Sequence, residues 1–152
     1  MTVHYLYGNV LDSTAEVLVC TTNTVGAMGK GIAKEFKEKV PGLYKAYRQH
    51  CFTQGNGLRQ HFVYPWGDRT VYCFHTKLHW GNDSKPEYVQ KGLYTLYYWM
   101  KKNHPASIAI PPLGCGNGNL DYARQVHPML IKFAEQFPHV EIQLYCPDDF
   151  RI

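Results

Sequence analysis

The chain has 152 residues, the length of one ordinary folded domain. Charged residues make up 18% and hydrophobic residues 45%, which excludes an intrinsically disordered chain and lets a core form without disulfides or a structural metal. The formal charge of +4 is compatible with an anionic partner but is too small to indicate a nucleic-acid-binding protein by itself. We expect one stand-alone domain over residues 1–152, present as a monomer.

The start of the chain lacks the basic and apolar regions of a signal peptide, and no apolar run reaches the roughly 18 residues that span a bilayer. These features favour a cytoplasmic protein without membrane contact. The five cysteines stand singly, without a C-x-x-C spacing, so we expect free thiols and no metal site.

In chain order, strand-like runs rich in β-branched and aromatic residues alternate with helical patterns. The predicted strands are 3–7, 16–21, 60–65, 70–75, 106–111 and 140–145, and the predicted helices are 29–39, 41–50, 86–103 and 121–136. Several of these strands are apolar on both parities, which is typical of strands covered on both faces. The sequence therefore predicts an α/β domain of three layers, α/β/α, with a central mixed sheet.

Local signals refine these elements. Pro86 suits the first turn of a helix, and Asp121 is a candidate N-cap for the last helix. Pro128 should bend that last helix or mark its true start. The turn at 65–68 joins two strands into a predicted hairpin, and 54–60 is a predicted turn.

A glycine-rich loop at 22–33 connects a buried strand to a helix. The free backbone N–H groups at the start of such a helix, together with its dipole, favour a phosphate group. Gly29-Lys30 resembles part of a P-loop, but no Ser or Thr follows Lys30. We therefore exclude nucleoside triphosphatase chemistry.

A second glycine loop, at 111–120, also lies between a buried strand and the start of a helix. Its alternating glycines allow backbone conformations closed to other residues and let a ligand touch the main chain. Ligands of open α/β sheets bind beyond the carboxyl ends of the strands, so the two loops can converge on one diphosphate. No histidine stands beside Cys115 in a recognisable pattern, so we do not expect thiol catalysis.

The glycine loops carry a family resemblance. Gly8-Asn9-Val10, the segment 23–33 and the segment 112–116 resemble the corresponding parts of macro domains. The stretch 75–80 (HTKLHW) further resembles the branch that contains the DNA ADP-ribosyl glycohydrolase antitoxin DarG and the terminal ADP-ribose protein glycohydrolase. The similarity covers nearly the whole chain.

The resemblance implies a macro fold that binds ADP-ribose in a cleft, with no cofactor and no metal. By position, Asn9 and Val10 would contact the adenine, Asn23 the distal ribose and the two loops the diphosphate. The implied ADP-ribose site comprises Asn9, Val10, Asn23, Val25, Gly26, Met28, Gly29, Gly31, Ile32, Leu113, Gly114, Cys115, Gly116, Asn117 and Gly118. Macro domains commonly carry Asp where Asn9 stands, so we expect an altered adenine preference and not a lost site.

The resemblance also implies that Lys77 is the catalytic residue. The matching lysine of the related glycohydrolases attacks or polarises the anomeric carbon of the ribose, and shielding from water can lower a lysine pKa enough to give the neutral amine. The terminal ADP-ribose protein glycohydrolase also uses an aspartate that falls on Gly118 here. Its absence favours a DarG-like site centred on the lysine.

The aromatic and histidine neighbours of this motif have less specific interpretations. His75 and His79 flank Lys77 and could touch a substrate, but they lack the spacing of a helical metal pair. Trp66 and Trp80 would each either stack on a base or fill the core.

We expect a hydrolase that removes ADP-ribose from a modified macromolecule, in the manner of DarG from a DNA base, with single-stranded DNA as a candidate partner. Two alternatives stay open: an ADP-ribose 1″-phosphate phosphatase and a non-catalytic ADP-ribose reader. The sequence does not decide which group carries the ADP-ribose or whether a partner transferase toxin exists.

Overall fold

The computed structural model describes residues 2–23, 28–29, 31–53, 61–77, 83–115 and 118–151, with the backbone alone at Asn23, Thr53 and Lys77. Six strands form one sheet in the order β1-β6-β5-β2-β4-β3. They are β1 (Thr2–Tyr7), β2 (Val17–Asn23), β3 (Phe62–Trp66), β4 (Arg69–Lys77), β5 (Ser107–Ile110) and β6 (Glu141–Cys146). Neighbours pair in parallel except β3 and β4, which form the predicted antiparallel hairpin. The mixed sheet is therefore confirmed.

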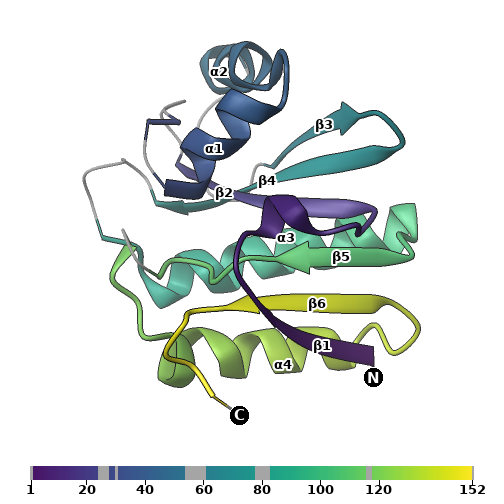
Figure 1. The fold of residues 1–152 in the computed structure, drawn as a ribbon, viewed down its shortest axis with the longest axis vertical. Helices are drawn as coiled ribbons and strands as arrows, with labels where there is room; N and C mark the ends of the chain where they lie inside the picture. Colours follow the sequence, from purple (N-terminus) through teal and green to yellow (C-terminus); the bar gives the residue numbers. More distant parts are fainter. Residues whose placement is uncertain are drawn as a thin grey trace.

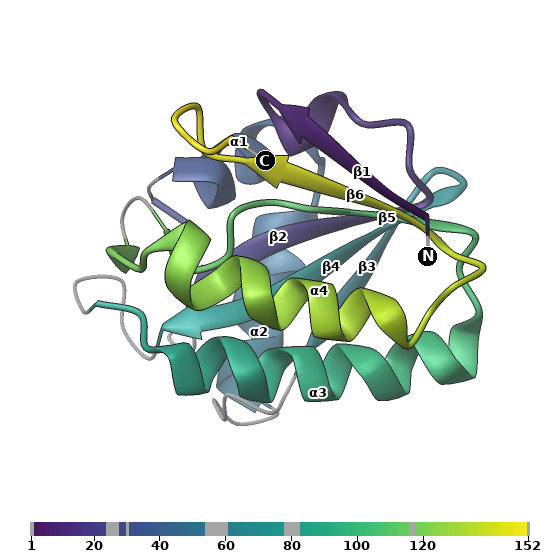
Figure 2. The same cartoon turned by 90° about the horizontal axis from the view of Figure 1, so that it is seen from below.

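Helices cover both faces of this sheet. The helices α1 (Gly31–Lys39) and α2 (Leu43–Thr53) lie on one face, and α3 (Pro86–Asn103) and α4 (His127–Glu135) lie on the other (Figures 1 and 2). A short 3₁₀ helix, η1 (Val10–Asp12), follows β1, and a π-helical turn, η3 (Tyr122–Val126), precedes α4. The predicted three-layer α/β/α fold is confirmed. No helix in the described part of the chain is both long enough and apolar enough to cross a membrane.

The strand β2 shows why the sheet is covered on both faces. Val17 and Val19 pack into the core beneath α3 and α4, whereas Leu18 and Cys20 pack into the core beneath α1 and α2. All four side chains are 1% exposed or less. A strand that is apolar on both parities can bury its side chains only between two layers, which is the arrangement that the sequence predicted.

The last α-helix is shorter than the predicted range 121–136, and it starts next to Pro128, as the second expectation for that residue predicted. Asp121 is the N-cap, since its carboxylate accepts a hydrogen bond from the backbone N–H of Arg124 at 3.1 Å. The chain then makes a π-helical turn, and the α-helix begins at His127 with Pro128 in its first turn. Proline has no N–H to donate to the preceding turn and its ring crowds the carbonyl there, so a continuous α-helix through Pro128 is disfavoured. Pro86 likewise begins α3.

The connections of the two central strands diverge. The chain continues from the carboxyl end of β2 toward α1 on one face, and from the carboxyl end of β5 toward η3 and α4 on the other face (Figure 2). The strands β2 and β5 are neighbours in the sheet. Such a switch in direction opens a crevice at the carboxyl ends of the strands, where open α/β folds bind their ligands.

Candidate functional site

Both glycine loops begin at the carboxyl ends of these two neighbouring strands. One follows β2 and the other follows β5, and Lys77 ends β4 on the other side of β2. Because these strands are parallel, their carboxyl ends lie at the same end of the sheet, which we call the carboxyl edge. The fold therefore brings the three predicted parts of the site to one place.

Asn23 and Lys77 are direct neighbours at the carboxyl edge. They are paired across the β2–β4 ladder, just after Thr22 pairs with His75. The register shifts between Thr22 and Asn23, which marks a bulge or irregularity in the ladder. Bulges change the direction in which side chains point and are over-represented beside active sites. The sequence did not predict this irregularity, because one-residue register shifts leave no clear pattern.

A buried polar pair lies immediately before these two residues. Thr22 is 5% exposed and His75 is 3% exposed, and a hydrogen bond of 2.9 Å joins Thr22 Oγ1 and His75 Nδ1. The pKa of His75 is lowered to about 4, mainly by burial and to a smaller extent by the neighbouring His50 and His61. His75 is therefore neutral near pH 7 and helps to fix the ends of β2 and β4 without adding a charge. His79 lies outside the described residues.

The residues that follow β1 are fixed by a small hydrogen-bond network. Asn9 caps η1, because its Oδ1 accepts from the backbone N–H of Leu11 at 2.9 Å. Its Nδ2 donates to Glu35 Oε1 on α1, also at 2.9 Å. Only an amide can do both, since an aspartate here would place two carboxylates together. This contact gives a physical reason for Asn where macro domains commonly carry Asp. The neighbouring Val10 is 1% exposed, so a ligand there would meet its main chain.

The described part of the first glycine loop has a buried side chain, Met28, and an exposed glycine, Gly29. Met28 is 1% exposed and lies in the core beneath α1. At Gly29, no atom of the described residues lies within 4 Å of where a Cβ would stand. Gly31 begins α1 with a φ of +56°, and Ile32 is half-buried. Two other residues of the implied site, Val25 and Gly26, lie outside the described residues.

The second glycine loop is fastened to the segment before α3. The backbone N–H of Ser84 donates to the carbonyl of Gly118 at 3.0 Å, and Asn119 Nδ2 donates to Asp83 Oδ1 at 2.7 Å. Leu113 is fully buried beneath the loop. These contacts hold the loop in one place over the carboxyl edge. Two further residues of the implied site, Gly116 and Asn117, lie outside the described residues.

Gly114 cannot be replaced without moving its neighbours. Its φ is +73°, and an added Cβ would stand 2.5 Å from Leu120 Cδ1 and 3.2 Å from Ser84 Cβ. Positive φ favours glycine on its own, and the close contacts add a steric requirement. This glycine therefore shapes the loop and lets it lie against the segment before α3.

Ser84 is a site candidate that the sequence did not reveal. It is 5% exposed, and its hydroxyl has no hydrogen-bond partner among the described residues. Buried hydroxyls without a partner are uncommon, and this one lies beside Gly114 at the second loop. Ser84 stands outside the glycine pattern, so only its place in the fold marks it.

Cys115 is unsuited to nucleophilic chemistry. Burial raises the pKa of its thiol to about 12, with a further contribution from the Asp121 carboxylate. The thiol donates to the carbonyl of Leu113 at 3.6 Å. A neutral thiol is a poor nucleophile, so this residue shapes the loop.

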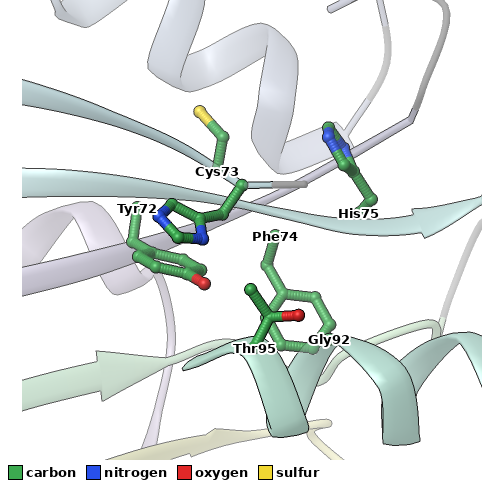
Figure 3. Close-up of a pocket in the computed structure, with 7 residues that line it drawn as sticks. Tyr72, Cys73, Phe74, His75, Gly92 and Thr95 are labelled. Carbon is green, nitrogen blue, oxygen red and sulfur yellow. The ribbon is translucent and has the colours of Figure 1, made fainter. Parts of the chain in front are cut away.

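A small pocket lies beside β4, and its lining includes His75. Figure 3 shows Phe74 next to Gly92 and Thr95 of α3, with Cys73 and His75 on the opposite side of the strand. The pocket leaves no room even for a water molecule, whereas typical ligand pockets have volumes of roughly 300–1,000 Å³. The pocket is too small for ADP-ribose. Among the described residues, no group of three or more metal-ligating side chains is placed to hold an ion.

Trp66 lies away from the predicted site. It ends β3 opposite Arg69, at the amino end of β4, and the guanidinium of Arg69 lies 4.6 Å from the ring centroid. Lys77 ends the same strand at its other end. Trp66 therefore packs against a neighbouring side chain and does not reach a ligand at the carboxyl edge. Trp80 lies outside the described residues.

Comparison with known proteins shows similarity to DNA ADP-ribosyl glycohydrolases and their macrodomains. A DNA ADP-ribosyl glycohydrolase of Thermus aquaticus is 38% identical over 149 residues, covering 95% of this chain, and the chain spans 41% of that protein's length. The structure of the macrodomain of Thermus aquaticus DarG matches with a TM-score of 0.90 at 38% identity, covering 96% of this chain and 99% of that one.

Two other relatives bear on the ligand. The structure of Thermosipho africanus DarTG in complex with ADP-ribose matches with a TM-score of 0.89 at 28% identity, covering 99% of this chain and 43% of that one. An ADP-ribose 1″-phosphate phosphatase of Neosartorya fischeri is 48% identical over a segment of 40 residues. That segment covers 26% of this chain and 19% of the phosphatase. The family model of the macro domain matches residues 19–129, which span both glycine loops and Lys77. The chain belongs to the macro domain family.

Proposed function

We propose that this macro domain is a DNA ADP-ribosyl glycohydrolase, which releases ADP-ribose from a base of single-stranded DNA. The observation that carries the proposal is the meeting of both glycine loops with the Asn23–Lys77 pair at one edge of the sheet. The 38% identity to a DNA ADP-ribosyl glycohydrolase, over 95% of this chain, supports the same activity.

In the proposed complex, the diphosphate lies between the start of α1 and the second glycine loop. Backbone N–H groups near Gly29 and Gly31 and the positive end of the α1 dipole would neutralise its charge. The unpartnered hydroxyl of Ser84 would donate to it from the side of the second loop. The adenine would lie near Asn9 and the distal ribose near Asn23. The ADP-ribose bound in the Thermosipho relative supports this ligand.

Lys77 is the proposed catalytic residue. Its neutral amine would attack the anomeric carbon of the distal ribose, the bond from that carbon to the base would break, and the base would leave with a proton. Water would then replace the lysine and release free ADP-ribose. No metal or cofactor takes part in this scheme.

The decisive experiment compares release of ADP-ribose from ADP-ribosylated single-stranded DNA by the wild type and by Lys77→Ala. We expect at least a hundredfold loss of turnover in the variant, because an activated nucleophile is removed. Lys91→Ala, which removes an exposed lysine from α3, is the matched control and should keep full activity. Equal release by Lys77→Ala and the wild type would show that this residue is not the nucleophile.

A second candidate function is hydrolysis of ADP-ribose 1″-phosphate, favoured by the 40-residue similarity to a phosphatase. The two activities differ in the bond that is cleaved at the same ribose. Release of inorganic phosphate from that compound, at a higher kcat/KM than release of ADP-ribose from DNA, would establish the phosphatase instead. Tight ADP-ribose binding without turnover of either compound would identify a reader.

A further inference from the structure

The outer surface of α1 and α2 carries most of the excess positive charge of the chain. Residues 31–53 contain five lysines and arginines and two glutamates, a net charge of +3, compared with +4 for the whole chain. Both glutamates have partners: Glu38 lies 4.0 Å from Lys34, and Glu35 accepts from Asn9. Within the described part of the chain, no carboxylate forms an ion pair with the remaining cations, so they can attract an anion.

Aromatic rings alternate with these cations along α2. Phe52 is 73% exposed, and the guanidinium of Arg48 lies 5.6 Å from its ring centroid. At the start of α2 is Tyr44, and Lys37 Nζ of the neighbouring helix α1 lies 4.3 Å from its ring centroid. The spacing of four residues from Tyr44 to Arg48 and from Arg48 to Phe52 puts all three on one face of the helix. We call Lys37, Tyr44, Arg48 and Phe52 the α2 stripe.

The α2 stripe leads toward the carboxyl edge. Near the start of α2, the Tyr64 hydroxyl donates to the carbonyl of Pro41 at 2.9 Å, and Tyr64 pairs with Val71 of β4. Further along the helix, the ring of Tyr47 lies 6.1 Å from the ring of His75, which is only two residues before Lys77. The helix therefore runs in the same direction as β4, and Phe52 lies at the end nearest the proposed catalytic residue.

We infer that the α2 stripe binds the part of a single-stranded DNA that flanks the ADP-ribosylated base. A neighbouring base stacks on the open face of Phe52, and backbone phosphates contact Arg48 and Lys37. Alternating aromatic and basic side chains are the usual means of binding a single strand, since every base offers a face for stacking and every phosphate a charge. This inference rests on the proposed function and names where the rest of its substrate lies.

A comparable surface on α3 is less suited to this role. Tyr94 and Tyr98 are 62% and 56% exposed, but their hydroxyls lie 3.2 Å apart and hydrogen-bond to each other. The helix α3 begins next to the carboxyl edge and runs away from it, so Tyr98 lies in the half of α3 farther from Lys77. These residues therefore supply a matched control on the other face of the sheet.

Binding of an unmodified, fluorescently labelled oligonucleotide tests the α2 stripe without catalysis. Phe52→Ala should raise Kd about fivefold or more and leave its salt dependence unchanged, because a stacking contact is lost. Arg48→Ala should raise Kd and reduce the slope of log Kd against log salt concentration by about 0.7, because one phosphate contact is lost. The control variants Tyr98→Ala and Lys102→Ala should bind as the wild type does. Unchanged binding by both α2 variants would overturn the inference.

Turnover separates this inference from the proposed function. For an ADP-ribosylated oligonucleotide, both α2 variants should raise KM at least threefold with little change in kcat, and for an ADP-ribosylated mononucleoside neither constant should change. Failure of the wild type to act on either compound would contradict the proposed function, while oligonucleotide binding would still test the stripe. A KM effect on ADP-ribosylated protein but not on DNA would assign the stripe to a protein partner and overturn the inference.

Discussion

Both faces of the sheet bury hydrophobic side chains, yet they differ in the polar groups that lie among them. On the α3–α4 face, β4 contributes the rings of Tyr72 and Phe74 to a continuous hydrophobic cluster. On the α1–α2 face, the same strand contributes His75, which pairs with Thr22. That second face also has the basic outer surface. The comparison indicates that both layers pack hydrophobic side chains against the strands, and that the α1–α2 layer also places polar groups beside the proposed site.

The largest expected effect concerns the buried His75. Its pKa is lowered to about 4 in the folded protein, from 6.5 for an exposed histidine, so the unfolded chain binds the proton more tightly. Stability should therefore be complete above pH 6.5 and fall as the pH is lowered toward about 4, by up to about 3 kcal/mol from this residue. Denaturant unfolding between pH 7 and pH 4 measures this loss.

The matched variant for this experiment is His75→Asn, whose amide can still reach Thr22. Its stability should depend less on pH than that of the wild type, while His139→Asn, at an exposed position, should leave the curve unchanged. His50 and His61 also have a pKa lowered by burial, so they add to the slope in all three proteins. Parallel curves for the wild type and His75→Asn would contradict the role of this side chain.

The α3–α4 face should respond to changes in side-chain volume. At Gly92 an added Cβ would stand 2.3 Å from the ring of Phe74, which is 1% exposed. Gly92→Ala should therefore cost about 2 kcal/mol of stability, since overpacking outweighs the gain in helix propensity. Thermal unfolding checks this, and adding Phe74→Leu should restore part of the loss. A stabilised Gly92→Ala would show that the ring can move aside at little cost.

The smallest expected effect tests the polar contact between β1 and α1. Asn9→Asp would face the Glu35 carboxylate in place of an amide donor, and we expect a loss of about 0.5 kcal/mol at pH 7 because the pair is exposed to solvent. Adding Glu35→Gln should remove the penalty. Chemical denaturation at low salt is the measurement, and a stabilised Asn9→Asp single variant would contradict this account of why Asn stands here.

Much of the fold followed from the sequence because its signals are local. Apolar residues on both parities of β2 predicted a strand between two layers, and Pro86 and Asp121 marked the starts of helical segments that the structure confirms. The order of the two glycine loops predicted that both would meet at the carboxyl ends of their strands. These features depend on backbone preferences within a few residues, which a sequence displays directly.

Other features depend on contacts between distant segments and were missed. The hydrogen bond between Asn9 and Glu35 joins the segment after β1 to a helix later in the chain. The burial of Ser84 depends on the second glycine loop, which lies against it. The π-helical turn before His127 was also missed, because the pattern for a longer α-helix continues through it. The role of each residue in the implied ADP-ribose site stays a prediction.

The place of β1 in the sheet determines when the proposed site is complete. This strand lies at the edge of the sheet and pairs with β6, more than 130 residues later in the sequence. Contacts so far apart in sequence form late, because a long loop must close before they gain any energy. During synthesis on a ribosome, the central strands can pair before β6 emerges. The adenine end of the proposed site, around Asn9, would then be the last part of the site to form.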